Sequence, residues 1–343
     1  MAEAAAILGE LRGVDEVGPL DPSELDARLK GASTPFVVRK VASDWPLVQA
    51  GVEQGGRGAR AYLLDHARDR MFEVNLGQPG KGGRLFYDEQ MAMNFRMGRA
   101  ALSDIFAGID ANSDKPDAPV IYLSSLTMRD YFEGLDEANR IDLSGRSTRD
   151  SIWIGTRSEI AAHNDLPNNL AVCAVGRRRF TLFPPECFAD LYLGPLENTP
   201  AGRAVSMVDL AAPDLDRYPR FRDALAAAQV AALEPGDALF IPSMWYHHVA
   251  ALEEFNVLVN YWWRDTAPWL GDPEQALLHA MLAVRDLPEV AREKWKVLFD
   301  HYVFSGGAEA AAHLPDGKGG VLEPLNPETA RRLRAYLLRS LSR

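Results

Sequence analysis

The chain has 343 residues, of which 47% are hydrophobic and 25% are charged, a composition typical of a globular enzyme. This composition excludes a disordered chain, a collagen-like repeat and a disulfide-rich miniprotein. Because 48 acidic residues outnumber 37 basic ones, the net charge of −11 disfavours broad binding to nucleic-acid phosphates. Two cysteines, no basic leader and no apolar run near the roughly 18 residues of a membrane span lead us to expect a cytoplasmic protein.

The first half of the chain predicts mostly short strands. Residues 22–31 predict a helix, because Asp21 or Ser23 can cap it and Pro22 lies in its first turn. Residues 34–41 then predict a strand, and the glycine-rich stretch 51–60 predicts a loop ahead of a helix near 60–68. Short apolar runs bounded by turn residues predict strands at 71–76, 84–87, 119–125, 151–155, 169–175 and 178–184.

In the second half of the chain the sequence pattern changes twice. Residues 186–230 are rich in Pro, Asp, Asn and Ala and predict a long excursion, after which 238–242 and 255–263 predict strands. Beyond Asp265 the pattern becomes helical, with one helix over 273–285 and another in the tail. The tail helix places Leu333, Leu337 and Leu341 on one face, which we expect to be buried on the body or in a subunit interface.

These elements predict a mainly β fold with flanking helices and a helical C-terminal region. We expect an N-terminal helical lead-in over 1–33, a β-rich domain over 34–265 and a helical region over 266–343.

Two histidines and a carboxylate form the most informative pattern. His163 and Asp165 are separated by one residue, so in an extended chain both side chains lie on the same side. A second histidine is available at His247 or His248, directly after the strand ending at 242. Two histidines and one carboxylate on one face of a metal leave positions open, as in non-haem Fe(II) sites. A His-x-Asp pair alone also fits a surface loop in which Asp165 caps a turn.

An arginine cluster enters the strand over 178–184. Alternation places Arg178 on the opposite face from Arg177 and Arg179, so one of these sets can point inward and bind a carboxylate through two hydrogen bonds. All three could equally face solvent or pair with acids. Asn260, in an otherwise apolar strand, needs hydrogen-bond partners, either backbone groups or a ligand.

Taken together, these residues resemble the JmjC or cupin-like oxygenases, closest to the branch of the asparaginyl hydroxylase of hypoxia-inducible factor. The resemblance covers about residues 34–265. The residues that carry it are WIG at 153–155, HND at 163–165, Asn169, GRRRFTLFPPE at 176–186, EPGDALFIPSMWYHHV at 234–249, VNYWW at 259–263 and, at the active-site rim, RLFYDEQMAMNF at 84–95.

The resemblance implies a double-stranded β-helix, or jelly-roll, enzyme that uses Fe(II), 2-oxoglutarate and dioxygen to hydroxylate a C–H bond. By position it implies that His163, Asp165 and His247 bind the iron, with His247 preferred to His248 as the first histidine after Trp245 and Tyr246. It assigns the cosubstrate to the following residues: Arg178 and Tyr122 for the far carboxylate, Asn169 and Asn260 as lining amides, and Trp262 as an apolar wall.

One position departs from the asparaginyl-hydroxylase pattern. Three residues before His163 that pattern has a threonine that donates to 2-oxoglutarate, whereas this chain has Ile160. The hydrogen bond must be lost or replaced, and the pocket becomes drier, which strengthens the pairing of Arg178 with a carboxylate.

The substrate is expected to be a protein or peptide side chain, with a small molecule or a tRNA base as alternatives and lysine demethylation less favoured. No membrane partner is expected, and nucleic acid is disfavoured by the net charge. A non-catalytic metal-binding cupin is a different class of function, and a zinc hydrolase is a third that has no need of the anion pocket. The resemblance also implies a homodimer through the C-terminal helices. Trp269 and Trp295 are candidates either for that interface or for the ordinary core of the region.

Overall fold

The computed structural model describes residues 8–80, 82–113, 115, 117–305 and 310–342. The chain forms two compact units, residues 1–264 and residues 265–343. Within the described residues, no helix is long and apolar enough to cross a membrane.

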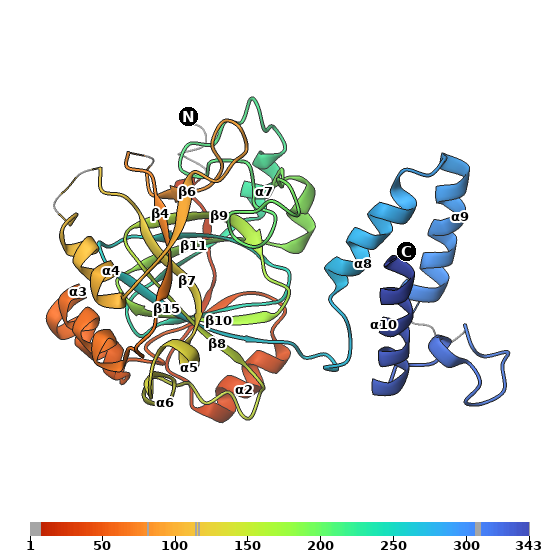
Figure 1. The fold of residues 1–343 in the computed structure, drawn as a ribbon, viewed down its shortest axis with the longest axis horizontal. Helices are drawn as coiled ribbons and strands as arrows, with labels where there is room; N and C mark the ends of the chain where they lie inside the picture. Colours follow the sequence, from red (N-terminus) through yellow and green to blue (C-terminus); the bar gives the residue numbers. More distant parts are fainter. Residues whose placement is uncertain (1–7, 81, 114, 116, 306–309, 343) are drawn as a thin grey trace. The chain divides into compact units, whose positions relative to one another are not determined.

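The larger unit is built from two β sheets (Figure 1). The first sheet contains six strands within the described residues, in the order β1-β12-β11-β14-β9-β5. Their bounds are β1 Arg12–Gly13, β12 Gln229–Leu233, β11 Arg178–Phe183, β14 Tyr246–Ala251, β9 Ser158–Asn164 and β5 Arg84–Leu85.

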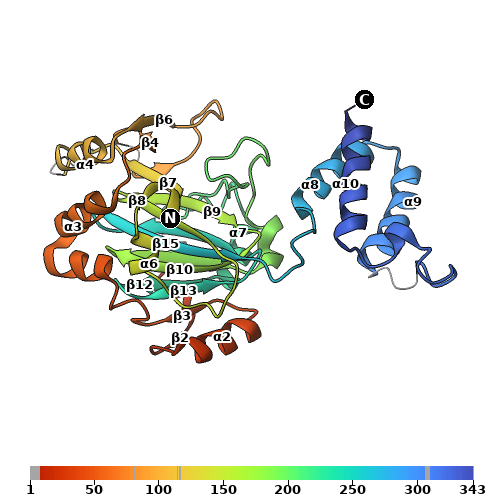
Figure 2. The same ribbon diagram turned by 60° about the horizontal axis from the view of Figure 1, so that its bottom comes forward.

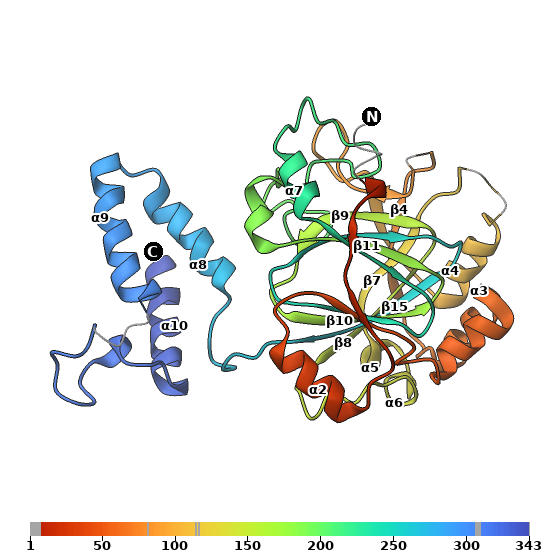
Figure 3. The same cartoon turned by 180° about the vertical axis from the view of Figure 1, so that it is seen from behind.

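The second sheet contains nine strands within the same described ranges, in the order β2-β3-β13-β10-β15-β8-β7-β4-β6. Their bounds are β2 Asp15–Val17, β3 Phe36–Val38, β13 Ala238–Ile241, β10 Asn168–Val175, β15 Asn256–Trp263, β8 Arg149–Gly155, β7 Ile121–Thr127, β4 Phe72–Gly77 and β6 Phe95–Ala100. The N-terminal segment joins both sheets, because β1 pairs with β12 and β2 pairs with β3 (Figure 3). This arrangement confirms the expected mainly β, jelly-roll type of fold.

Strand β10 shows how the two layers share one core. Ala171 and Cys173 pack in the cluster that includes Phe180 and Leu182 of β11, so this face of the nine-stranded sheet meets the six-stranded one. Leu170 and Val172 alternate with them and pack in the larger cluster on the opposite face. A strand buried on both faces reads as a continuous apolar run, which explains why this strand was predictable.

Helices cover the outer face of the nine-stranded sheet (Figure 2). They are α2 Pro22–Gly31, α3 Pro46–His66, α4 Leu102–Asp110, α5 Met128–Tyr131 and α6 Leu135–Ala138. The prediction for α2 is confirmed: Asp21 is its N-cap and accepts hydrogen bonds from the backbone N–H groups of Ser23 and Glu24.

The predicted loop over 51–60 is wrong, because this stretch lies inside α3. The helix bends at Gly55, whose φ of 63° is available to glycine without strain. A Cβ at Gly56 would lie only 2.9 Å from the Cβ of Phe255, so the helix packs too closely for a side chain there. The glycines therefore allow close helix packing and a kink, rather than a loop.

The long excursion over 186–230 is confirmed. It contains only the short helices η1 Pro185–Ala189 and α7 Phe221–Ala227 before β12 begins at Gln229. Strands β1, β2, β6, β9, β12 and β14 were not predicted as separate elements. Of these, β1 and β2 lie in the segment 1–33, which differs from the expected helical lead-in because the chain adds short strands to both sheets before α2 begins.

The smaller unit is helical, as predicted. It contains α8 Pro273–Ala280, which continues as a π-helical turn η2 Met281–Arg285, then α9 Glu289–Phe299, a second π-helical turn η3 Asp300–Phe304, η4 Gly320–Leu322 and α10 Pro327–Leu341. Within the unit, the Trp269 indole donates a hydrogen bond to the carbonyl oxygen of Leu325 at 3.0 Å.

Candidate metal centre and anion pocket

Two antiparallel strands of the six-stranded sheet position the metal-ligand candidates. In β9 and β14, His163 lies directly opposite His247 in the register, with ring centroids 4.5 Å apart. Asp165 follows the end of β9, and its Oδ2 is 3.7 Å from Nε2 of His247. One ligand atom from each of His163, Asp165 and His247 lies within 4.8 Å of the other two. The structure therefore brings all three predicted ligands to one point.

Backbone carbonyls orient both imidazoles. Nδ1 of His163 is 2.9 Å from the carbonyl oxygen of Ala161, and Nδ1 of His247 is 3.3 Å from that of Trp245. When each Nδ1–H donates to its carbonyl, Nε2 keeps the lone pair that a metal needs. Burial and, to a smaller extent, the adjacent His163 lower the pKa of His247 to about 4, against the opposing effect of Asp165, so the ring is neutral at physiological pH.

His248 lies outside this cluster. Its Nε2 is 4.0 Å from Oε2 of Glu159, and burial lowers its pKa to about 3. Because side chains alternate along β14, His248 faces away from Asp165 when His247 faces toward it. The geometry agrees with the choice of His247 over His248.

Arg178 forms the opposite end of the site. It is the first residue of β11 and only 2% exposed, whereas Arg177 is exposed and pairs with Glu253 at 2.5 Å. The predicted inward orientation of Arg178 is therefore confirmed. Its Nε atom is buried without a hydrogen-bond partner. Burial lowers the pKa of the guanidinium, and a buried cation of this kind requires an anionic partner.

Tyr122 lies close enough to Arg178 for the two groups to shift each other's pKa. Burial raises the pKa of Tyr122 to about 12, and the positive charge of Arg178 opposes that shift. The phenol is therefore protonated and has an O–H group to donate. A guanidinium and a phenol in the same buried space suit a carboxylate.

Two asparagine side chains form a hydrogen-bonded series that ends at Asp165 of the metal-ligand cluster. Nδ2 of Asn260 donates to Oδ1 of Asn169 at 2.6 Å, and Nδ2 of Asn169 donates to Oδ2 of Asp165 at 3.3 Å. These contacts orient the Asp165 carboxylate. Oδ1 of Asn260 and Nε1 of Trp262 remain buried without partners.

All eight predicted site residues line one cavity of about 620 Å³. They are His163, Asp165, His247, Arg178, Tyr122, Asn169, Asn260 and Trp262. Ile160 also lines it, as do Leu85, Met93 and Phe95 of the predicted rim segment 84–95. The fold therefore gathers the predicted residues from six different strands, β7, β9, β10, β11, β14 and β15, and from the segment directly after β9.

Two polar residues in this region were missed. Trp153 lines the cavity, and its Nε1 is buried without a partner. Ser151 is fully buried, its Oγ has no hydrogen-bond partner, and it lies opposite Asn260 in the β8–β15 register. Alternation places Ser151 on the same face of β8 as Trp153. Ser151 is a polar residue in the apolar run 151–155, and this was the sequence feature that could have pointed to it.

A two-sheet β fold that holds two histidines and a carboxylate beside a buried arginine defines a metal-binding cupin type of protein. The chain belongs to the family of the cupin-like domain, whose profile matches residues 22–267.

Several curated relatives are similar to part of the chain. The tRNA wybutosine-synthesizing protein 5 of Mus musculus is 33% identical over 150 residues, 39% of this chain and 44% of that protein. The lysine-specific demethylase JMJ31 of Arabidopsis thaliana is 34% identical over 116 residues, 34% of this chain and 21% of that protein. The HSPB1-associated protein 1 of Homo sapiens is 33% identical over 143 residues, 40% of this chain and 28% of that protein. The chain spans less than half the length of these relatives.

Proposed function

We propose that the chain is an Fe(II)- and 2-oxoglutarate-dependent dioxygenase that hydroxylates a C–H bond of a protein or peptide side chain. The observation that carries this proposal is the buried guanidinium of Arg178, which has no anionic partner among the described residues and shares a cavity with the His163, Asp165 and His247 cluster. A metal site alone has no need of a buried cation. A site that binds a metal together with a dicarboxylate needs both.

The residues present fit these groups. His163, Asp165 and His247 would hold Fe(II) through two imidazole nitrogens and one carboxylate oxygen, which leaves coordination positions open. When bound, Fe(II), 2-oxoglutarate and dioxygen supply the oxidation of the C–H bond, with succinate and carbon dioxide as the other products. The protein contributes binding, orientation and exclusion of water.

Different residues of the cavity would bind the cosubstrate, orient the metal ligand and exclude water. Arg178 would pair with the far carboxylate of the cosubstrate, and the protonated Tyr122 would donate a hydrogen bond to it. The chain of Asn260 and Asn169 holds the Asp165 carboxylate in place. Ile160 lines the cavity with an apolar side chain and so keeps water from competing for Arg178.

Binding of 2-oxoglutarate tests the proposal without requiring the substrate. Isothermal titration under nitrogen, with Fe(II) present, measures the affinity of the wild type and of Arg178→Ala. We expect Arg178→Ala to weaken binding about 100-fold, because a charge-assisted pair in a buried site is lost. Arg177→Ala is the matched control, since Arg177 is exposed and pairs with Glu253, and it should bind normally. Equal affinities for Arg178→Ala and the wild type would contradict the proposal.

The name of one relative favours another substrate within the same chemistry. A relative that is named for wybutosine synthesis acts on tRNA, which makes hydroxylation of a modified tRNA base the second candidate. Succinate release measured with bulk tRNA and with peptide pools separates the two.

We also propose that the C-terminal unit mediates homodimer formation. Within its described residues, α8, η2, α9 and η3 contain no buried residue. Large apolar side chains such as Leu282, Trp295 and Phe304 are exposed there. Apolar groups gathered on one small unit are typical of a subunit interface.

A further inference from the structure

The cavity mouth is positively charged in a chain of negative net charge. Among the described residues that line the cavity, the only carboxylate is Asp165, whereas the arginines are Arg149, Arg178 and Arg203. Asp165 belongs to the metal-ligand cluster, and Arg178 is assigned to the cosubstrate. Arg149 therefore adds a positive charge that neither the metal nor the cosubstrate requires.

Arg149 is held at the mouth by an aromatic ring. It is the first residue of β8, lies opposite Trp262 in the register, and has its guanidinium carbon 5.8 Å from the centre of the Trp262 ring. Among the described residues, no hydrogen bond or ion pair engages its guanidinium. An arginine that meets only the face of an aromatic ring keeps N–H groups available to bind a planar anion.

Arg203 occupies another part of the same lining. Its Nε donates to the carbonyl oxygen of Asn164 at 3.2 Å, and its Nη2 lies 3.4 Å from Oδ1 of the same residue. Asn164 separates His163 from Asp165, so this positive charge lies beside the metal-ligand cluster.

A groove continues from the cavity along strands β4 and β6. A second hollow of about 270 Å³ is lined by residues of these strands and shares Asn75, Met97 and Ser124 with the cavity. β6 is the last strand in the order of its sheet within the described residues, so its outer edge has no neighbouring strand. Such an edge can pair with an extended peptide.

The groove is lined by groups that suit a peptide. Nδ2 of Asn75 donates to Oγ of Ser124 at 3.2 Å, which leaves the Ser124 hydroxyl proton available. Ser125 has a φ of 51° at an irregularity in the β7–β8 register, and it lines the cavity. Glu73 in the groove is neutralised by Arg99. The net charge of −11 disfavours a nucleic acid as the occupant of the groove.

We propose that Arg149 is a substrate-binding residue that pairs with a carboxylate of an extended peptide lying along β4 and β6, so that the enzyme selects acidic peptide segments. This inference rests on the proposed function, because it concerns the substrate of that same site.

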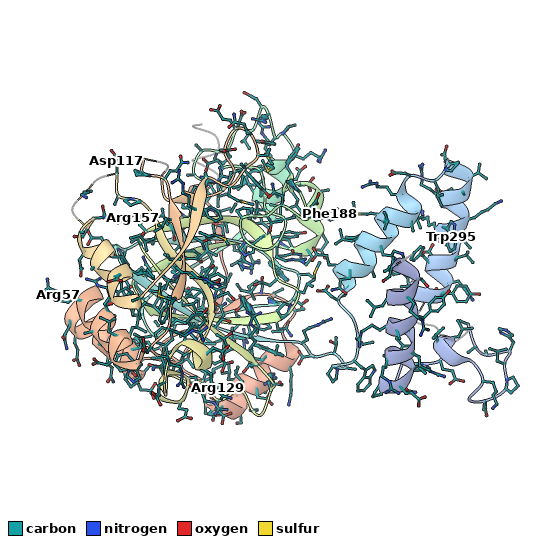
Figure 4. The ribbon with its side chains drawn as sticks, in the orientation of Figure 1. Arg57, Asp117, Arg129, Arg157, Phe188 and Trp295 are labelled. Carbon is teal, nitrogen blue, oxygen red and sulfur yellow. The ribbon has the colours of Figure 1, made fainter. Side chains whose placement is uncertain are left out.

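Degenerate peptide pools test the inference directly. Fluorescein-labelled pools of one length, containing either acidic or basic residues among neutral ones, are titrated with the full chain loaded with Fe(II) and 2-oxoglutarate under nitrogen. Anisotropy is recorded at about 0.15 M salt, which screens long-range attraction. A labelled single-stranded oligouridylate is titrated in parallel. Arg149→Glu is compared with Arg57→Glu, because Arg57 is exposed on α3 and points away from the body (Figure 4).

We expect the wild type to bind the acidic pool more tightly than the basic pool. Arg149→Glu should weaken acidic-pool binding about tenfold, and Arg57→Glu, with the same change in net charge, should not. Equal losses in the two variants, no preference for acidic peptides, or tighter binding of the oligouridylate would each overturn the inference. The same samples are titrated with 2-oxoglutarate. Normal affinity for it without an acidic preference refutes this inference alone, whereas no affinity in the wild type refutes the proposed function.

Discussion

The two units of the chain use apolar residues in opposite ways. In residues 1–264, strands such as β10 are buried on both faces, and the polar atoms left without partners gather mostly around one cavity. In the described part of residues 265–343, α8 and α9 bury nothing, and Trp295 and Leu298 are 46% and 41% exposed. Unpaired buried polar groups indicate a missing ligand, whereas exposed apolar groups indicate a missing protein surface.

The largest expected effect is the loss of iron binding when a histidine of the metal centre is replaced, compared with a histidine of the C-terminal unit. His163→Ala removes one of three ligands, so tight Fe(II) binding and succinate production should be lost. His279→Ala, on exposed α8, is the control and should bind iron like the wild type. Metal content after dialysis, measured by atomic absorption, gives the comparison. Unchanged iron content in His163→Ala would exclude this residue as a ligand.

Charges placed on the C-terminal unit should change the assembly state. Trp295, labelled in Figure 4, and Leu298 both lie on α9, and the double variant Trp295→Asp, Leu298→Asp should convert a dimer into a monomer. Light scattering coupled to size-exclusion chromatography measures the mass. The affinity for 2-oxoglutarate should not change, since the pocket lies in the other unit. A wild-type chain that is already monomeric at micromolar concentration would refute the dimer.

A methyl group added to the packed helix face should destabilise the protein moderately. At Gly56 the new Cβ would lie 2.9 Å from the Cβ of Phe255, and we expect Gly56→Ala to cost about 1–3 kcal/mol. At Gly271 nothing lies within 4 Å of an added Cβ, so Gly271→Ala should change stability little. Urea denaturation of both variants measures the difference. If Gly56→Ala were as stable as Gly271→Ala, the close contact between α3 and Phe255 would be refuted.

The smallest expected effect concerns Ser151. Its buried hydroxyl has no partner, and Ile160 cannot donate the hydrogen bond that the asparaginyl-hydroxylase pattern has at that position. We expect Ser151→Ala to weaken 2-oxoglutarate binding about fivefold, the effect of one neutral hydrogen bond. Ser124→Ala, at the cavity mouth, should leave this affinity unchanged. A Ser151→Ala variant that binds 2-oxoglutarate like the wild type would show that this hydroxyl makes no contact with it.

The sequence predicted the doubly buried strands and the ligand pattern well, and it failed where packing overrides local composition. Strands β10 and β15 are long apolar runs, and the His-x-Asp spacing places two ligands on one side of a strand end. The glycines of α3 were predicted as a loop because their reasons appear only in the fold: Gly51 and Gly56 lie close to Val175 and Phe255, and Gly55 has a positive φ at the kink. Strand β14 contains the polar pair His247 and His248, which hid its strand character. Ser151 was missed because an isolated serine in an apolar strand carries no periodic signal.

The most direct test of the central claim is an anaerobic titration of the full chain with Fe(II) and then 2-oxoglutarate, followed by visible absorption. A weak metal-to-ligand band that requires both additions is predicted, because 2-oxoglutarate would chelate an iron with open positions. The band should be absent in His163→Ala and greatly weakened in Arg178→Ala. Iron that binds without any band, and without a measurable affinity for 2-oxoglutarate, would contradict the dioxygenase assignment and favour a metal-binding cupin of another function.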